Sequence, residues 1–418
     1  MRVVVAIFHI GLIASIAYLL AKRWNEAKSK LFWSTFIYHL ITGACVGMIY
    51  LYYYKANDTW LFFEGAKQLS NLAHDDFGAY LQLIFSFDAG NDVVLIDTDF
   101  RSLIFVKMLS LLCIVTWNNY WICAAYFSLL SFGASWFLFR KVKLYFEEST
   151  VAASGAFLFF PSVVFWSSGI VKETLALASL YFLAGILLQF FYEKKIDKLV
   201  LILALFAGTI LWALKYYWAG VFFIAALSAI IVQQVSSKSV LVKKRIVISY
   251  ILSFVFMGVA VSFLHPNFYL HRFLEVLVAN HNAFVKLSDD HNLIHYYQLN
   301  ASVGSVALNS LWALVSGIFR PVIGEGRSAF GLVASLENLI VLVLFISFLW
   351  RLGEKKQPVT ILGLAAISYC VVLCVFLALS TPNLGTLSRY RVGFLPFLIF
   401  MISYRNPLVD WLTKKFSN

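Results

Sequence analysis

The chain has 418 residues, of which 61% are hydrophobic and only 13% are charged, and its formal net charge is +12. A soluble protein of this length needs far more charge to cover its surface, so the composition excludes a soluble globular protein and predicts an all-α polytopic membrane protein. The basic excess does not indicate a nucleic-acid partner, because the lysines and arginines are concentrated in alternate connections between apolar segments.

Apolar runs long enough to cross a bilayer recur along the whole sequence and predict about eleven transmembrane helices in a single domain, residues 1–418. The predicted spans are 3–21, 31–53, 118–139, 150–169, 173–192, 198–214, 217–234, 246–264, 329–350, 358–379 and 388–405. No stretch between them is polar and long enough to form an independent soluble domain.

The connections between these spans differ in charge from one side to the other. One set holds 20 basic and 7 acidic residues, and the other set holds 13 basic and 14 acidic residues. This positive-inside pattern predicts an N-terminus outside, a C-terminus in the cytoplasm, and two long outer connections, 54–117 and 265–328. Compact loops and few cysteines favour a bacterial cytoplasmic membrane as the location.

Two shorter apolar segments are predicted to be interfacial or re-entrant helices on the outer face. Residues 103–117 contain Lys107 and are short for a span, which needs roughly 20 residues. Treating this segment as a span would invert every later connection and destroy the alternation of charge. Residues 308–319, which end at Arg320-Pro321, form a second segment of this kind.

The first outer connection carries a candidate catalytic carboxylate, Asp58, directly after a predicted span. Helical spacing places Asp58 on the apolar face with Phe62 and Leu69, so the carboxylate is expected at the membrane boundary. A carboxylate in that position can act as a general base on a hydroxyl group. The alternative is that Asn57 or Asp58 serves only as the N-cap of a helix.

A second candidate is the pair Lys172-Glu173, which follows a span that contains Pro161. Ionisable groups at this depth are costly unless they are paired or line a polar cavity. Lys172 is therefore a candidate for binding a phosphate with Glu173 in support, and the alternative is a simple ion pair at helix ends. A further outer turn is predicted at Lys215-Tyr216-Tyr217-Trp218.

The third candidate is Arg389-Tyr390-Arg391, just before the last predicted span. Two arginines at i and i+2 in a loop suit a phosphate or pyrophosphate, because each guanidinium donates two parallel hydrogen bonds. Arg320 is a candidate third member. Interfacial arginines also contact lipid headgroups, but an outer-face pair opposes the positive-inside bias and therefore favours function.

Metal chemistry is not expected. His291 and His295 are spaced i, i+4 after two aspartates, but no third ligand has suitable spacing, so a solvated loop is the better interpretation. The five cysteines all fall in apolar segments and are expected to be small core side chains.

Together these segments resemble the GT-C superfamily of integral-membrane glycosyltransferases, which take sugars from polyprenyl-phosphate donors. In the shared plan, a span is followed by an outer loop that opens with an acidic residue and continues as a helix with an aromatic residue and small residues. An interfacial helix comes next. It is followed by a span that ends in basic residues and by a span that contains a proline and has an acidic residue at its outer end. Here these features are Asp58, Phe62, Gly65-Ala66, residues 103–117, Phe139-Arg140-Lys141, Pro161 and Glu173. The resemblance covers roughly residues 31–195 and Arg389-Tyr390-Arg391.

The resemblance implies an enzyme that transfers a hexose or pentose to an outer-face glycan, lipid or protein in cell-surface polysaccharide or glycoconjugate assembly. Asp58 would deprotonate the acceptor hydroxyl, and the leaving phosphate would be stabilised by Arg389, Arg391, Lys172 and Arg320, with Glu173 and Tyr390 in support. The implied partners are a polyprenyl-phosphate-linked sugar, or another lipid-linked glycan, and the bilayer, with no cofactor or metal. The sequence departs from the family plan in an extra span before the acidic loop and in Asn57-Asp58 where paired acidic residues are common.

Two other functions stay open. An O-antigen or exopolysaccharide polymerase or ligase also uses outer-face arginines and a large late outer loop, as at 265–328, and would depend on the arginines and not on Asp58. A non-enzymatic transporter of polysaccharide or lipid usually has repeated halves or helices broken in mid-membrane, and neither is clear in this sequence.

Overall fold

Every regular element that the structure describes is a helix, which confirms the all-α prediction. The structure is a computed structural model, and it describes residues 2–54, 58–86, 99–263, 269–326, 328–354 and 359–416. The chain divides into two compact units: unit 1 comprises Met1–Val142 and Phe157–Tyr216, and unit 2 comprises Lys143–Ala156 and Tyr217–Asn418. Each unit has its own buried apolar core.

Seven helices in the described part of the chain are long and apolar enough to cross a membrane. They are α1 (Arg2–Arg23), α2 (Lys30–Tyr52), α6 (Tyr120–Tyr145), α9 (Lys172–Glu193), α10 (Lys198–Ser236), α15 (Ala329–Glu354) and α16 (Ile361–Ser380). These helices support the prediction that the chain is a membrane protein. They correspond to eight of the eleven predicted spans, because α10 contains two of them.

The other three predicted spans are shorter or interrupted helices. Their elements are α7 (Thr150–Ser154), a π-helix (Gly155–Phe159), α8 (Pro161–Trp166), α12 (Ile246–Ser262), α17 (Leu384–Tyr390), a 3-10 turn (Arg391–Gly393) and α18 (Leu395–Ser403). Pro161 and Pro396 each lie in the first turn of a new helix, the position that proline favours, which explains why 150–169 and 388–405 are not continuous. The count of eleven spans stays a prediction.

Helix α10 runs through the predicted spans 198–214 and 217–234 without a connecting loop. It departs from helical geometry at Lys215, where φ is −142° and ψ is 63°. The turn expected at this position is therefore a kink within one helix. Residues up to Tyr216 belong to unit 1 and the remainder of α10 belongs to unit 2.

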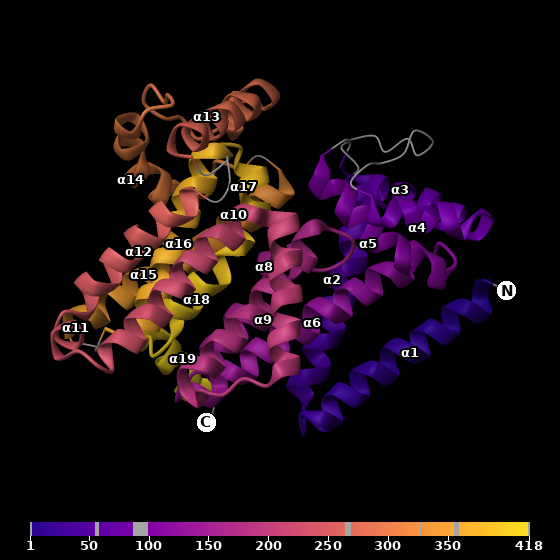
Figure 1. The fold of residues 1–418 in the computed structure, drawn as a ribbon, viewed down its shortest axis with the longest axis horizontal. Helices are drawn as coiled ribbons and strands as arrows, with labels where there is room; N and C mark the ends of the chain where they lie inside the picture. Colours follow the sequence, from indigo (N-terminus) through magenta and orange to yellow (C-terminus); the bar gives the residue numbers. More distant parts are fainter. Residues whose placement is uncertain are drawn as a thin grey trace. The chain divides into compact units, whose positions relative to one another are not determined.

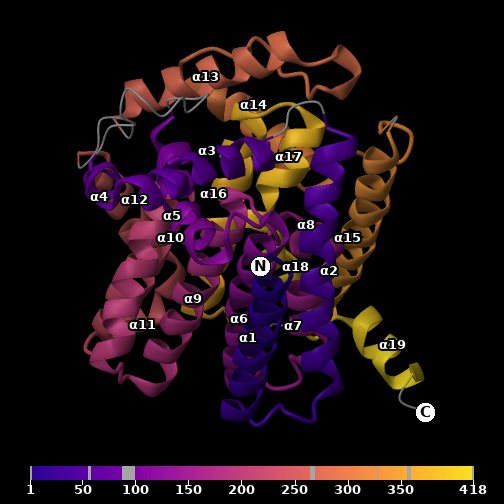
Figure 2. The same ribbon diagram turned by 90° about the vertical axis from the view of Figure 1, so that its right-hand side faces the viewer.

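In unit 1, three helices form a layer across one end of α2, α6 and α9 (Figures 1 and 2). They are α3 (Asp58–Asp75), α4 (Phe77–Phe85) and α5 (Phe100–Thr116), and α3 packs along both α4 and α5. The segment predicted as an interfacial helix at 103–117 is thus α5, a helix of 17 residues.

Two sets of aromatic and ionic contacts mark the two ends of unit 1. At the end that carries α3, Trp60 stacks on Tyr120 with ring centroids 3.8 Å apart. At the other end, the Arg140 guanidinium lies 5.5 Å from the ring of Trp24, and Lys141 Nζ lies 3.5 Å from Glu193 Oε1. The basic ends of α6 and α9 and the turn after α1 therefore meet at the end opposite to α3 and α5.

In unit 2, α13 (Leu270–Leu287) and α17 form a similar end layer, and α14 (Val303–Phe319) packs along α16 (Figures 1 and 2). The segment between α13 and α14 wraps the end of α16: Tyr296 Oη donates to the Ala378 carbonyl at 2.9 Å, and the Ile294 N–H donates to the Pro382 carbonyl at 2.9 Å. At the opposite end lies α19 (Pro407–Phe416).

Candidate functional site

Lys172 and Glu173 begin α9, and the turn before them is fixed by a close contact between helices. Gly169 has a φ of +75°, and the carbonyl oxygen of Gly43 lies 2.8 Å from the place that a Cβ at position 169 would occupy. The N–H of Gly169 donates to Ser128 Oγ at 3.1 Å. These contacts with α2 and α6 set where α9 begins and therefore where its first two side chains lie.

The most deeply buried charges at this end of unit 1 are Glu173 and Lys215. Lys215 Nζ donates to Glu173 Oε1 at 2.7 Å, and the two side chains are 5% and 0% exposed. Glu173 also lies in the first turn of α9, where the helix dipole favours a negative charge. The kink at Lys215 coincides with this ion pair.

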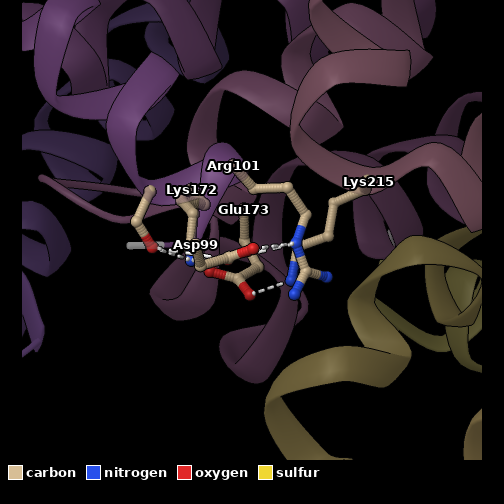
Figure 3. A network of polar contacts seen from close by, with 6 residues as sticks. Asp99, Arg101, Lys172, Glu173 and Lys215 are labelled. Atoms are coloured by element: carbon tan, nitrogen blue, oxygen red, sulfur yellow. Dashed lines mark hydrogen bonds and ion pairs between the residues drawn. The ribbon is translucent and has the colours of Figure 1, made fainter. Parts of the chain in front are cut away.

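Lys172 belongs to a neighbouring set of polar contacts (Figure 3). Its Nζ donates to Ser102 Oγ at 3.0 Å and lies 3.8 Å from Asp99 Oδ2, which in turn accepts a bond from Arg101 Nε at 3.1 Å. Asp99, Arg101 and Ser102 come from the start of α5. The Lys172 cluster is here defined as Asp99, Arg101, Ser102, Lys172, Glu173 and Lys215.

Asp58 begins α3 and is half-buried. The next residue, Thr59, is buried, and its Oγ1 lies 2.8 Å from Tyr120 Oη, which anchors the start of the helix on α6. Phe62 follows Asp58 by one turn on the same face of α3, and Lys172 Nζ lies 5.0 Å from the centre of its ring. The face of α3 that carries Asp58 is therefore directed toward the Lys172 cluster.

The electrostatics of the Lys172 cluster suit an anion. As defined from the described residues, the cluster contains three cationic side chains (Arg101, Lys172 and Lys215) and two carboxylates (Asp99 and Glu173). Lys215 is close to Glu173, whereas Lys172 has Ser102 as its hydrogen-bond acceptor among the described residues and is 3.8 Å from the nearest carboxylate oxygen. An ammonium has three donors, so Lys172 retains capacity for a phosphate oxygen. Its side chain is 16% exposed.

In unit 2, Arg391 is enclosed by α15. It is 1% exposed, its Nη1 donates to Asn338 Oδ1 at 2.6 Å, and its Nη2 lies 4.0 Å from Glu337 Oε2. The Asn338 amide donates in turn to the carbonyl of Pro321 at 2.8 Å. Asn338 thus links the predicted arginine motif to the segment that follows Arg320.

Arg320 forms a two-pronged ion pair with Glu325. Its Nε lies 3.0 Å and its Nη2 2.9 Å from Glu325 Oε1, and the N–H of Val322 donates to Glu325 Oε2 at 2.9 Å. Arg389 and Tyr390, at the end of α17, are half-buried. Of the three predicted phosphate-binding arginines, all of which lie in unit 2, Arg391 and Arg320 thus have intramolecular carboxylate neighbours.

The Arg320–Glu325 pair predicts a pH-dependent contribution to stability. Burial alone would raise the pKa of Glu325, but the hydrogen bonds from Arg320 and from the Val322 amide hold this pKa below its usual value. A lowered pKa in the folded state stabilises the protein above the unfolded pKa of about 4.3, and the contribution is lost as the pH falls through the folded value. Glu325→Gln should lower the free energy of unfolding by about 1 kcal/mol at pH 7.

Thermal unfolding of the wild type and of Glu325→Gln at pH 7 and at pH 4 measures this effect. The difference between the two proteins should shrink at the lower pH. If the difference in stability between the two proteins were the same at both pH values, the ionised Glu325 carboxylate would not be its cause.

Two described histidines of the connection 265–328 have local partners. His295 Nε2 lies 3.6 Å from Asp290 Oδ1, and His281 Nδ1 lies 2.9 Å from the Leu379 carbonyl oxygen. Within the described ranges, no group of three or more His, Cys, Asp or Glu residues is arranged to hold a metal ion.

The sequence analysis identified Lys172 and Glu173 but not their partners, Asp99, Ser102 and Lys215. Lys215 carried a usable signal, because a lysine in the interior of a 39-residue, largely apolar helix needs a carboxylate partner. Asn57, the alternative N-cap of α3, lies outside the described residues.

Comparison of this chain with protein-family models, with curated proteins and with solved structures finds no match.

Proposed function

We propose that the chain is a membrane glycosyltransferase that moves a sugar from a polyprenyl-phosphate donor to an outer-face glycan, lipid or protein acceptor. The observation that carries the proposal is the placement of Asp58 and Lys172. Lys172 Nζ lies 5.0 Å from the ring of Phe62, and Asp58 precedes Phe62 by one turn on the same face of α3, at the end of unit 1 opposite to its basic turns. A group-transfer site with a phosphate leaving group needs these two chemical roles.

In the proposed reaction, Asp58 accepts the proton of the acceptor hydroxyl as its oxygen attacks the anomeric carbon of the donor sugar. The new carbon–oxygen bond forms as the bond from the anomeric carbon to the phosphate oxygen breaks, and the lipid phosphate leaves with the electron pair. Lys172 stabilises the negative charge on that phosphate. Lys215 and Glu173 hold the start of α9, and with it Lys172, in place.

The proposed setting is the cytoplasmic membrane of a bacterium, with about eleven spans, the N-terminus outside and the C-terminus in the cytoplasm. The positive-inside rule assigns the basic turns near Trp24, Arg140 and Lys194 to the cytoplasmic side. Asp58 and the Lys172 cluster then belong to the outer side, where lipid-linked donors and surface acceptors are found.

The decisive experiment is Asp58→Asn, tested in proteoliposomes with polyprenyl-phosphate-linked radiolabelled sugars and a mixed acceptor fraction from the cell envelope. Loss of the general base should reduce the rate of transfer by about 10²–10⁴-fold with little change in thermal stability. Glu64→Gln is the matched control, because Glu64 is an exposed carboxylate on the same helix, paired with Lys67 at 3.0 Å. Equal activity of Asp58→Asn and wild type would end the assignment of Asp58 as the base.

A polymerase or ligase of lipid-linked glycans is the second candidate, favoured by the half-buried Arg389 and Tyr390 at the end of α17, in the end layer of unit 2. This function predicts that Arg389→Ala or Arg320→Ala abolishes product formation whereas Asp58→Asn does not.

A further inference from the structure

Helix α19 (Pro407–Phe416) is held at a fixed angle to α18 by a buried corner. Arg405 adopts a left-handed φ of +52°, and Asn406 is fully buried. The Asn406 side chain accepts hydrogen bonds from Ser347 Oγ at 2.7 Å and from the N–H of Leu408 at 2.9 Å, and it donates to the carbonyl of Leu344 at 2.9 Å. These bonds join the start of α19 to α15, so α19 is a positioned element of unit 2.

The side chains of α19 are divided between two faces. Leu408, Trp411 and Leu412 are spaced i, i+3 and i+4 on one face, and Trp411 and Leu412 are 55% and 38% exposed. Asp410 and Lys414, spaced i, i+4, lie on the opposite face and are exposed. An exposed tryptophan beside an exposed leucine on a short helix is typical of a helix lying in the interface of a bilayer.

The charges around this apolar face indicate which lipids it meets. Lys415 follows Leu408 by seven positions and therefore lies on the same face, with its Nζ 5.0 Å from the Trp411 ring, so its stem can cover apolar surface while its ammonium reaches a headgroup. Lys414 is adjacent, and Arg351 lies at the same corner, with its Nη1 2.6 Å from the Tyr404 carbonyl oxygen. Cations next to an exposed apolar strip complement anionic headgroups.

We propose that α19 is an interfacial helix that places Trp411 and Leu412 in the headgroup region of the bilayer and binds anionic phospholipid headgroups through Lys414 and Lys415. This surface is independent of the transfer reaction proposed for unit 1.

The test uses a bimane probe on a single cysteine, at position 412 (Leu412→Cys) or at position 410 (Asp410→Cys), in a full-length variant with the five native cysteines replaced. In proteoliposomes, brominated lipid should quench the probe at 412 more strongly, and aqueous iodide should quench the probe at 410 more strongly. The proposal would be overturned if iodide quenched the probe equally at both positions. It would also be overturned if neither reagent reached the probe at 412, because a second copy of the chain would then cover this face.

The choice of lipid is tested with the same probe at 412, by comparing brominated phosphatidylglycerol with brominated phosphatidylcholine. We expect a binding preference for phosphatidylglycerol that Lys414→Gln and Lys415→Gln each reduce by up to about fivefold. Equal quenching by the two lipids, unchanged in the double variant, would exclude anionic lipid as the partner of α19.

Discussion

Lys215→Met will be among the most destabilising single substitutions in unit 1, with an expected loss of about 3–5 kcal/mol in the free energy of unfolding. The substitution removes a cation that lies 2.7 Å from a carboxylate whose side chain is 0% exposed. A buried charge that loses its partner keeps its desolvation cost without the compensating attraction. The loss should appear as a large decrease in the midpoint of thermal unfolding in detergent micelles.

The double variant Glu173→Gln, Lys215→Met distinguishes the ion pair from simple loss of packing. With the carboxylate neutralised, most of the lost stability should return, because a buried ion pair replaced by uncharged groups of similar volume is often neutral in stability. Lys67→Met is the matched control, since its exposed pair with Glu64 should contribute less than about 1 kcal/mol. A double variant as unstable as Lys215→Met would assign the effect to the lysine side chain's packing.

The helices could be predicted from the sequence because hydropathy is a local property. The apolar runs that predicted 173–192 and 329–350 correspond to α9 and α15 within a few residues. The interruption near Pro161 was also open to prediction, since proline removes a backbone donor and clashes with the preceding turn. That signal was outweighed by the continuous apolar composition of 150–169.

The polar pairs could not be predicted in the same way, because they join residues that are far apart in the chain. Glu173 and Lys215 are 42 positions apart, and Lys172 and Ser102 are 70 positions apart. The sequence shows that each ionisable residue in an apolar helix needs a partner, but packing of the helices decides which partner it has. Residue type therefore located Lys172 as a candidate, and only the structure supplied Asp99 and Ser102.

The same limit applies to Arg391, whose predicted partner was a phosphate. In the structure its neighbours are Asn338 and Glu337, which lie within the predicted span 329–350. An arginine in a membrane helix bundle can be retained for either reason, because an ion pair within the protein and a bound phosphate both compensate the guanidinium charge.

Arg391→Met should destabilise the protein by about 3–5 kcal/mol, because it leaves the Glu337 carboxylate, whose side chain is 7% exposed, without its cation at 4.0 Å. Adding Glu337→Gln should restore most of the unfolding free energy, measured as for Lys215→Met. Sugar transfer by the same double variant then separates the two roles of Arg391. Restored stability with restored transfer means that Arg391 only holds α15 against the turn after α17. Restored stability without transfer means that Arg391 or Glu337 also serves the reaction, and the single variant Glu337→Gln separates them: if it transfers sugar normally, the missing function is that of the guanidinium.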